Sequence, residues 1–264
     1  MSIFFPGEYL DSTYDIDFDK LYKDGYRAVI FDVDNTFTID TVKNCVVATL
    51  STIDGSPIYY TLDGTEPTSS SARYKAPVEL AQSCVIKAKA IGKRGATRTF
   101  EEELTYSKAT AKPVAYLQPA YKGYDYAGAQ TLVDGLKGNH NYRTGRWIGF
   151  AGNDFELLID LQEITDVQRV SLSTCVEKGD WVFDARGFTI SVSIDGNDYS
   201  TVFDEQYPAM AATDANKIYN HVLEFAPAKA RYVKVKGLVE HSMPEWHGAK
   251  GHRAFLFVDE VAVY

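Results

Sequence analysis

The feature that most constrains the fold of this 264-residue chain is an alternation of apolar and polar residues with a period of two. The strictest run covers residues 188–194 and ends at an Asp195-Gly196 turn. A strand that buries one face produces this pattern, because successive side chains of a strand point to opposite faces. Residues 114–264 contain no ten-residue helical pattern. The chain is therefore predicted to fold mainly as short strands.

Similar runs recur on both sides of a short linker at 109–113 that ends in a proline. After the linker they cover residues 155–161, 170–176, 232–236 and 255–264, and before it they cover 46–51, 58–62, 84–90 and 97–106. Several short strands separated by turn signals are typical of β-sandwiches. We predict an all-β chain with a small Ig- or fibronectin-like β-sandwich over 38–110 and a galactose-binding-like jelly roll over 111–264.

Residues 1–37 differ, because they read as a short mixed α/β segment. A short helix is predicted over 17–25, and the apolar run 26–31 is expected to form a buried parallel strand. This strand leads into Asp32-Val33-Asp34-Asn35-Thr36. The segment resembles the start of haloacid-dehalogenase superfamily phosphatases. That resemblance implies that Asp32 is a nucleophile that also holds Mg²⁺, and that Asp34 is a general acid/base.

The rest of the chain lacks the βαβ periodicity and the later residues that such phosphatase chemistry requires. We therefore interpret residues 1–37 as a truncated or fused segment, with a Mg²⁺-dependent phosphatase kept as an alternative.

Charge and cysteine content narrow the range of partners. The chain has 27 Lys and Arg against 36 Asp and Glu, for a net charge of −9. This balance argues against nucleic-acid and anionic membrane partners and is compatible with neutral ligands and cations. The 3 cysteines are too few and too scattered for a disulfide framework. No apolar run has transmembrane length, and the N-terminus lacks the pattern of a signal peptide.

Two further stretches carry resemblances. Gly55–Thr68, with its Asp63-Gly64 turn, is similar to the small β-sandwich that follows the catalytic barrel in bacterial β-N-acetylhexosaminidases. Residues 114–264 resemble discoidin or coagulation-factor type C domains. The supporting segments are Leu132–Leu136, Trp147–Phe150, Met243–Gly248 and Phe257–Val261.

The resemblances imply a non-catalytic, carbohydrate-binding accessory region of a β-hexosaminidase-like glycoside hydrolase, whose catalytic domain is absent from this chain. The expected partners are glycans with terminal galactose, GalNAc or GlcNAc. The parent family is periplasmic or secreted. The alternative is a purely structural tail that supports the missing barrel.

The candidate site residues follow from this reading. A sugar site needs an aromatic platform with hydrogen-bonding groups around it, and the candidates that fall in predicted loops are Trp181, Trp246, His247, Tyr142 and Arg143. Such sandwiches often hold a structural Ca²⁺, which implies a shell of Asp134, Glu260 and the backbone carbonyls of Leu132 and Asn139. Asp259 precedes Glu260 on a predicted strand, so the two side chains are expected to face opposite ways.

Overall fold

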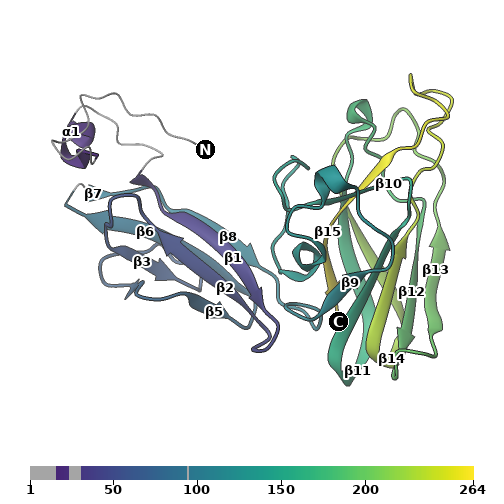
Figure 1. Ribbon diagram of the computed structural model, residues 1–264, viewed down its shortest axis with the longest axis horizontal. Coiled ribbons are helices and arrows are strands. Elements are labelled where there is room, and N and C mark those ends of the chain that lie inside the picture. The colour runs from purple at the N-terminus through teal and green to yellow at the C-terminus, as the bar shows by residue number, and fades with distance from the viewer. Residues whose placement is uncertain (1–15, 24–30, 94) are drawn as a thin grey trace. The chain divides into compact units, whose positions relative to one another are not determined.

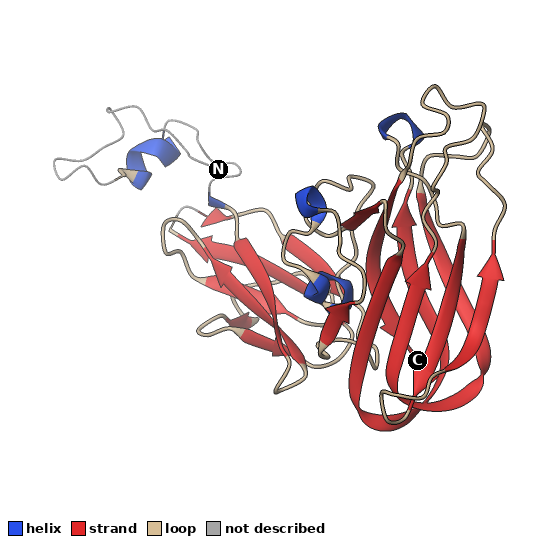
Figure 2. Ribbon diagram, turned by 45° about the vertical axis from the view of Figure 1, so that its right-hand side comes forward, coloured by secondary structure: helices blue, strands red, loops and turns tan. Residues whose placement is uncertain are grey.

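The computed structural model describes residues 16–23, 31–93 and 95–264. The chain forms two compact units (Figure 1), of which the first comprises Met1–Phe37, Val47–Leu80 and Cys84–Glu103, and the second Thr38–Val46, Ala81–Ser83 and Leu104–Tyr264. Figure 2 shows that nearly all regular structure is strand, so the predicted all-β fold is confirmed. In the described part of the chain, no helix is long and apolar enough to cross a bilayer.

Two small sheets lie in the N-terminal part of the described chain. The first has the order β1-β2-β5, and the second has the order β4-β3-β6-β7 with β8 also paired to β6. Their bounds are β1 Asp34–Asp40, β2 Cys45–Ser51, β3 Ile58–Thr61, β4 Ala72–Arg73, β5 Val78–Leu80, β6 Cys84–Gly92, β7 Gly95–Ala96 and β8 Phe100–Leu104. The predicted strands at 46–51, 58–62, 84–90 and 97–106 correspond to β2, β3, β6 and β8 and are confirmed. Leu50, Ile58, Ala88 and Ala90 bury the inward face of these strands.

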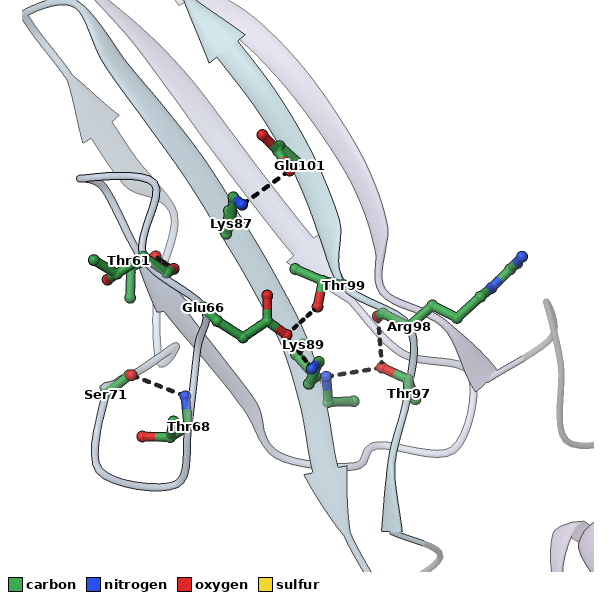
Figure 3. A network of polar contacts seen from close by, with 12 residues as sticks. Thr61, Glu66, Thr68, Ser71, Lys87, Lys89, Thr97, Arg98, Thr99 and Glu101 are labelled. Carbon is green, nitrogen blue, oxygen red and sulfur yellow. Dashed lines mark hydrogen bonds and ion pairs between the residues drawn. The ribbon is translucent and has the colours of Figure 1, made fainter.

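The outward face of β6 carries charges that are paired (Figure 3). Lys87 Nζ lies 3.1 Å from a carboxylate oxygen of Glu101. Lys89 pairs with Glu66, which also accepts a hydrogen bond of 2.6 Å from the Thr99 hydroxyl. Each of these two lysines thus has a carboxylate partner on a neighbouring segment.

The helix predicted over 17–25 is present within the described residues, and positions 24 and 25 lie outside them. Helix α1 covers Phe18–Lys23, and the Asp17 carboxylate caps it by accepting a hydrogen bond of 2.9 Å from the Lys20 amide. Phe31 packs edge-on against Phe18, with ring centroids 6.1 Å apart. The strand expected over 26–31 lies, except for Phe31, outside the described residues.

The C-terminal unit is a β-sandwich whose strands form one 7-stranded sheet. Its strand order is β10-β15-β11-β14-β12-β13, with β9 also paired to β11. The strands are β9 Val114–Tyr116, β10 Ile148–Ala151, β11 Phe155–Cys175, β12 Gly187–Ser193, β13 Ser200–Gln206, β14 Ile218–Gly237 and β15 Phe255–Val263. Three short 3₁₀ helices lie in its loops: η3 Lys122–Tyr124, η4 Ala129–Val133 and η5 Lys178–Asp180.

The long strand β11 joins two segments that the sequence separates. The residue pattern predicts one strand over 155–161 and another over 170–176. The structure runs them together through register shifts between Asp160 and Thr165, where Gln162 has a φ of 68°. A bulge bends a strand without ending it, so the alternation is interrupted while the strand continues.

Apolar side chains from both halves of β11 share one core. Leu157 and Leu172 belong to it together with Phe188 and Ile190 of β12. The predicted strand over 188–194 ends one residue early, at Ser193, and Ile194 is 51% exposed. Burial of these apolar faces is the main favourable contribution to folding. The packed core thereby holds in place the strand ends that carry the loops.

Candidate functional site

A cavity opens at the end of the sandwich where β11 ends and β15 begins. Its volume is about 240 Å³. One wall is the turn that contains η5, and another comes from the loops that precede β10. The lining residues are Tyr124, Tyr142, Arg143, Gly179, Asp180, Trp181, Val182, Phe255 and Phe257. The cavity is thus lined by aromatic rings with one carboxylate and one guanidinium among them.

Asp180 is the polar centre of this cavity. Its Oδ2 atom accepts a hydrogen bond of 2.6 Å from the Tyr142 hydroxyl and one of 3.0 Å from Nη2 of Arg143. Burial, and then the hydrogen bond to Asp180, raise the pKa of Tyr142, so the phenol stays protonated and keeps donating. The Asp180 and Arg143 side chains remain 44% and 59% exposed. Both groups can therefore reach a ligand in the cavity.

Trp181 forms an aromatic wall from an unusual backbone conformation. Its φ is 66°, in the left-handed region that residues other than glycine rarely adopt. The turn is held because the Trp181 amide donates to the Lys178 carbonyl at 3.0 Å and the Phe255 amide donates to the Trp181 carbonyl at 2.8 Å. Trp181 is still 40% exposed. Strain that keeps a large apolar ring at the surface is typical of functional sites.

Trp246 and His247 lie outside the cavity lining. The Trp246 indole donates to the Met210 carbonyl at 3.0 Å, and its ring stacks on Phe183. His247 Nδ1 accepts from the Ala249 amide, while Nε2 lies 3.0 Å from the Lys178 carbonyl. The polar atoms of both residues are thus used within the fold, next to the turn that carries Trp181.

The structure therefore brings together three of the five predicted sugar-site residues, namely Trp181, Tyr142 and Arg143. Sequence reasoning missed Asp180, Tyr124 and Phe255. Two of these carried a usable signal, because Asp180 directly precedes Trp181 and Tyr124 lies in the tyrosine-rich stretch 121–126. Phe255 carried none, since an aromatic residue at the start of a strand is ordinarily a core residue.

A second polar cluster lies around β15 and the loop that follows η4. Glu260 Oε2 accepts a hydrogen bond of 2.8 Å from the Gly135 amide, and Asp259 Oδ2 accepts one of 2.7 Å from the Gly138 amide. The two carboxylates thus turn toward the same loop, and the expectation that they face opposite ways is wrong. Glu260 has a φ of 37°, and the register to β11 shifts there, which breaks the alternation of the strand.

These two carboxylates are buried and incompletely satisfied. Asp259 Oδ1 and Glu260 Oε1 have no hydrogen-bond partner. Burial, opposed by the Gly138 amide and reinforced by the charge of Asp134, raises the pKa of Asp259 to about 7. Burial and the charges of Asp134 and Asp259 raise the pKa of Glu260 as well. Two unpaired anionic oxygens in a buried cluster are costly unless a proton or a cation neutralises them.

The cluster fits part of the shell that was predicted for Ca²⁺. Asp134 and Glu260 do lie near each other, and Asp259 joins them. The Asn139 carbonyl already accepts the Trp147 indole N–H at 2.9 Å. Within the described residues, no three Asp, Glu, His or Cys side chains are placed so that they alone would hold a metal ion. Backbone carbonyls, which Ca²⁺ readily takes as ligands, would have to complete the shell.

The acidic pair near the N-terminus has a different environment. Asp32 is clamped by Arg98, whose Nε and Nη2 lie 2.7 and 2.6 Å from its Oδ2. Asp34 is exposed at the start of β1 and accepts a hydrogen bond of 3.0 Å from the Asn35 amide. The carboxylate of Asp32 is therefore neutralised by a guanidinium.

Comparison with known proteins gives two family matches. The F5/8 type C domain model matches residues 114–251, and the Fn3 associated model matches residues 48–103. The discoidin-like resemblance stated from the sequence is confirmed. A comparison with curated proteins finds no match.

Solved structures that this chain matches include chitosan-binding module 1 of a chitosanase/glucanase from Paenibacillus sp. IK-5. It is 20% identical, covers 60% of this chain and 98% of its own, and has a TM-score of 0.39. A fucose binding module of Streptococcus pneumoniae is also 20% identical, covers 60% of this chain and 94% of its own, and has a TM-score of 0.39.

Proposed function

Because this chain belongs to the F5/8 type C domain family, we propose that its C-terminal domain binds carbohydrate in the cavity lined by Tyr142, Asp180 and Trp181. The observation that carries the proposal is the combination of exposed aromatic surface with a partly exposed carboxylate and guanidinium in one cavity. Binding sites for small ligands combine an apolar lining with a few convergent polar groups in this way.

Each group has a defined task in such a complex. The face of Trp181 packs against the C–H face of a sugar ring, which removes apolar surface from water. The Asp180 carboxylate accepts hydrogen bonds from sugar hydroxyls, and the Arg143 guanidinium donates to sugar oxygens. Tyr142 donates to Asp180 and so orients it. No bond is made or broken, so the domain acts by holding a glycan.

The expected ligand is the terminal residue of a neutral glycan, ending in galactose, GalNAc or GlcNAc. A cavity of about 240 Å³ is on the scale of a single sugar ring. The charges of Asp180 and Arg143 offset each other across 3.0 Å, so the cavity offers neither a net anionic nor a net cationic surface. This pairing supports a neutral sugar over a charged one.

We also propose that the cluster of Asp134, Asp259 and Glu260 takes a Ca²⁺ ion with a structural role. The support is the presence of two unpartnered, buried carboxylate oxygens. The backbone carbonyls of Leu132 and Asn139 remain the proposed additional ligands. A bound cation would neutralise the buried charge and fix the loop over 134–138 against β15.

For the whole protein, we propose an accessory region of a β-N-acetylhexosaminidase-like glycoside hydrolase that is secreted or periplasmic. The order of an Fn3 associated segment followed by an F5/8 type C domain supports an accessory role. In this proposal, residues 1–37, 38–110 and 111–264 are a phosphatase-like segment, a spacer sandwich and the binding domain.

Isothermal titration calorimetry with galactose, GalNAc and GlcNAc at millimolar concentrations tests the binding function. At least one sugar is expected to give a saturable isotherm that Trp181→Ala abolishes. Ile194→Ala is the matched control, because it removes an apolar side chain that is 51% exposed, against 40% for Trp181, and lies outside the cavity. This variant is expected to bind normally. Absence of heat with all three sugars would favour the purely structural alternative.

A further inference from the structure

An aromatic side chain lies just beyond the cavity and is held in a strained conformation. Tyr126 is 49% exposed and is not among the residues that line the cavity. Its φ is 42°, at the second position of a tight turn that the Gly128 amide closes onto the Asp125 carbonyl. Glycine or asparagine is usual where such a turn requires positive φ. The tyrosine at this position therefore holds an exposed ring in a strained backbone conformation, as residues of binding sites often do.

One ring contact and one electrostatic interaction connect Tyr126 to residues of the cavity. Its ring centroid lies 6.4 Å from that of Tyr124, which lines the cavity. Burial and the neighbouring Tyr124 raise the pKa of Tyr126, and the positive charge of Arg143 partly opposes this rise. Gly145 lies against the ring, because a Cβ added to this glycine would be 3.7 Å from Cδ1 of Tyr126. The ring nevertheless keeps about half of its surface exposed, since Tyr126 is 49% exposed. Tyr126 thus continues the aromatic wall outward from the sugar cavity.

We propose that Tyr126 forms a second sugar subsite, which contacts the residue linked to the terminal sugar and makes the domain prefer a disaccharide end to a free monosaccharide. The inference rests on the proposed binding function of the cavity. A cavity of about 240 Å³ holds one ring, so the next sugar of a glycan must leave it over the rim. Over the rim beside Arg143, the apolar face of that sugar meets the Tyr126 ring.

Tyr121 provides a matched comparison. It is 46% exposed, and its ring lies 5.9 Å from that of Tyr124. It packs edge-on against Phe255 at 5.1 Å, and its amide donates to the Gly149 carbonyl from a segment of ordinary φ. Tyr121 therefore has nearly the same exposure as Tyr126 and the same aromatic neighbour, Tyr124, but it lacks the positive φ.

Paired titrations test the subsite in the full chain. Each monosaccharide is compared with a disaccharide that ends in it: galactose with lactose, GlcNAc with N,N′-diacetylchitobiose, and GalNAc with GalNAc-β-1,3-galactose. For the pair that binds, the disaccharide is expected to bind about fivefold more tightly, the effect of one aromatic contact. Tyr126→Ala is expected to remove this gain and leave monosaccharide affinity unchanged, whereas Tyr121→Ala is expected to preserve it.

Two more variants keep the test independent of folding. Tyr126→Asn removes the ring while suiting positive φ, so it should fold normally and lose the gain, whereas Tyr126→Phe should retain it. The inference is overturned if the monosaccharide binds but its disaccharide binds no more tightly, if Tyr126→Asn keeps the gain, or if Tyr121→Ala abolishes it. If none of the six sugars binds, the proposed function fails and the subsite fails with it.

Discussion

The C-terminal domain places its acidic side chains in two contrasting environments. Asp180 lies in an open cavity, 44% exposed, with both of its hydrogen-bond donors on one oxygen. Asp259 and Glu260 are buried, and each has one oxygen that lacks a partner. The contrast separates two kinds of ligand. An exposed, oriented carboxylate suits sugar hydroxyls, whereas buried, unpaired carboxylate oxygens require a proton or a cation.

The largest expected effect is a pH dependence of stability in the metal-free protein. Asp259 has a pKa of about 7 in the folded chain against an ordinary value of 3.8. Because the folded state then binds more protons than the unfolded state, the free energy of unfolding falls as pH rises from about 4 to about 7. The loss is about 4 kcal/mol for this group. Urea denaturation in EGTA at several pH values measures it.

Calcium provides the control for that experiment. Millimolar Ca²⁺ at pH 7.5 should restore stability, by about 2.7 kcal/mol at a hundredfold excess over its dissociation constant. The effect should disappear in Glu260→Gln, which removes the charge at nearly constant shape. Equal stability with Ca²⁺ and with EGTA would contradict the cation proposal, and a flat pH profile in EGTA would contradict the burial argument.

A smaller effect, on sugar affinity, is expected from a change of the exposed carboxylate of Asp180. Asp180→Asn keeps the shape of the cavity but removes the charge that strengthens hydrogen bonds to sugar hydroxyls. Affinity for the sugar that binds is expected to fall about tenfold, with little change in melting temperature. Asp195→Asn is the control, because Asp195 is engaged by the amides of its own turn. Unchanged binding in Asp180→Asn would remove this carboxylate from the site.

The smallest effect is expected on stability, when the ion pair between Asp32 and Arg98 is broken. Asp32→Asn breaks the ion pair with Arg98, which is 67% exposed, so stability should fall by less than about 1 kcal/mol. Neither the wild type nor this variant is expected to release phosphate from p-nitrophenyl phosphate with Mg²⁺. Phosphate release by the wild type that is lost in Asp32→Asn would instead support the phosphatase alternative.

Period-two patterns predicted the strand content and the core well, because alternation follows directly from burial on one face. They failed where the backbone departs from regular geometry. The positive φ of Gln162 joins two predicted strands, and that of Glu260 turns two neighbouring carboxylates toward one loop. Neither residue is a glycine, so the sequence carries no signal for either irregularity.

The candidate site was predictable only in part. Trp181 and Trp246 are both in loops and have similar exposure, 40% and 39%. What distinguishes them is that Trp246 is hydrogen-bonded to Met210 and lies against Phe183. Those contacts depend on how three loops pack together. Residue type and position along the chain do not determine such packing.

The most direct test of the central claim, that a sugar binds beside Trp181, is to follow the indole N–H signals of the 3 tryptophans by ¹H–¹⁵N NMR during titration with the sugar that binds. The Trp147 and Trp246 indoles donate to the Asn139 and Met210 carbonyls, so their signals should stay in place. The Trp181 signal should shift in a saturable way. A shift of the Trp246 signal with Trp181 unchanged would place the site elsewhere and contradict the account.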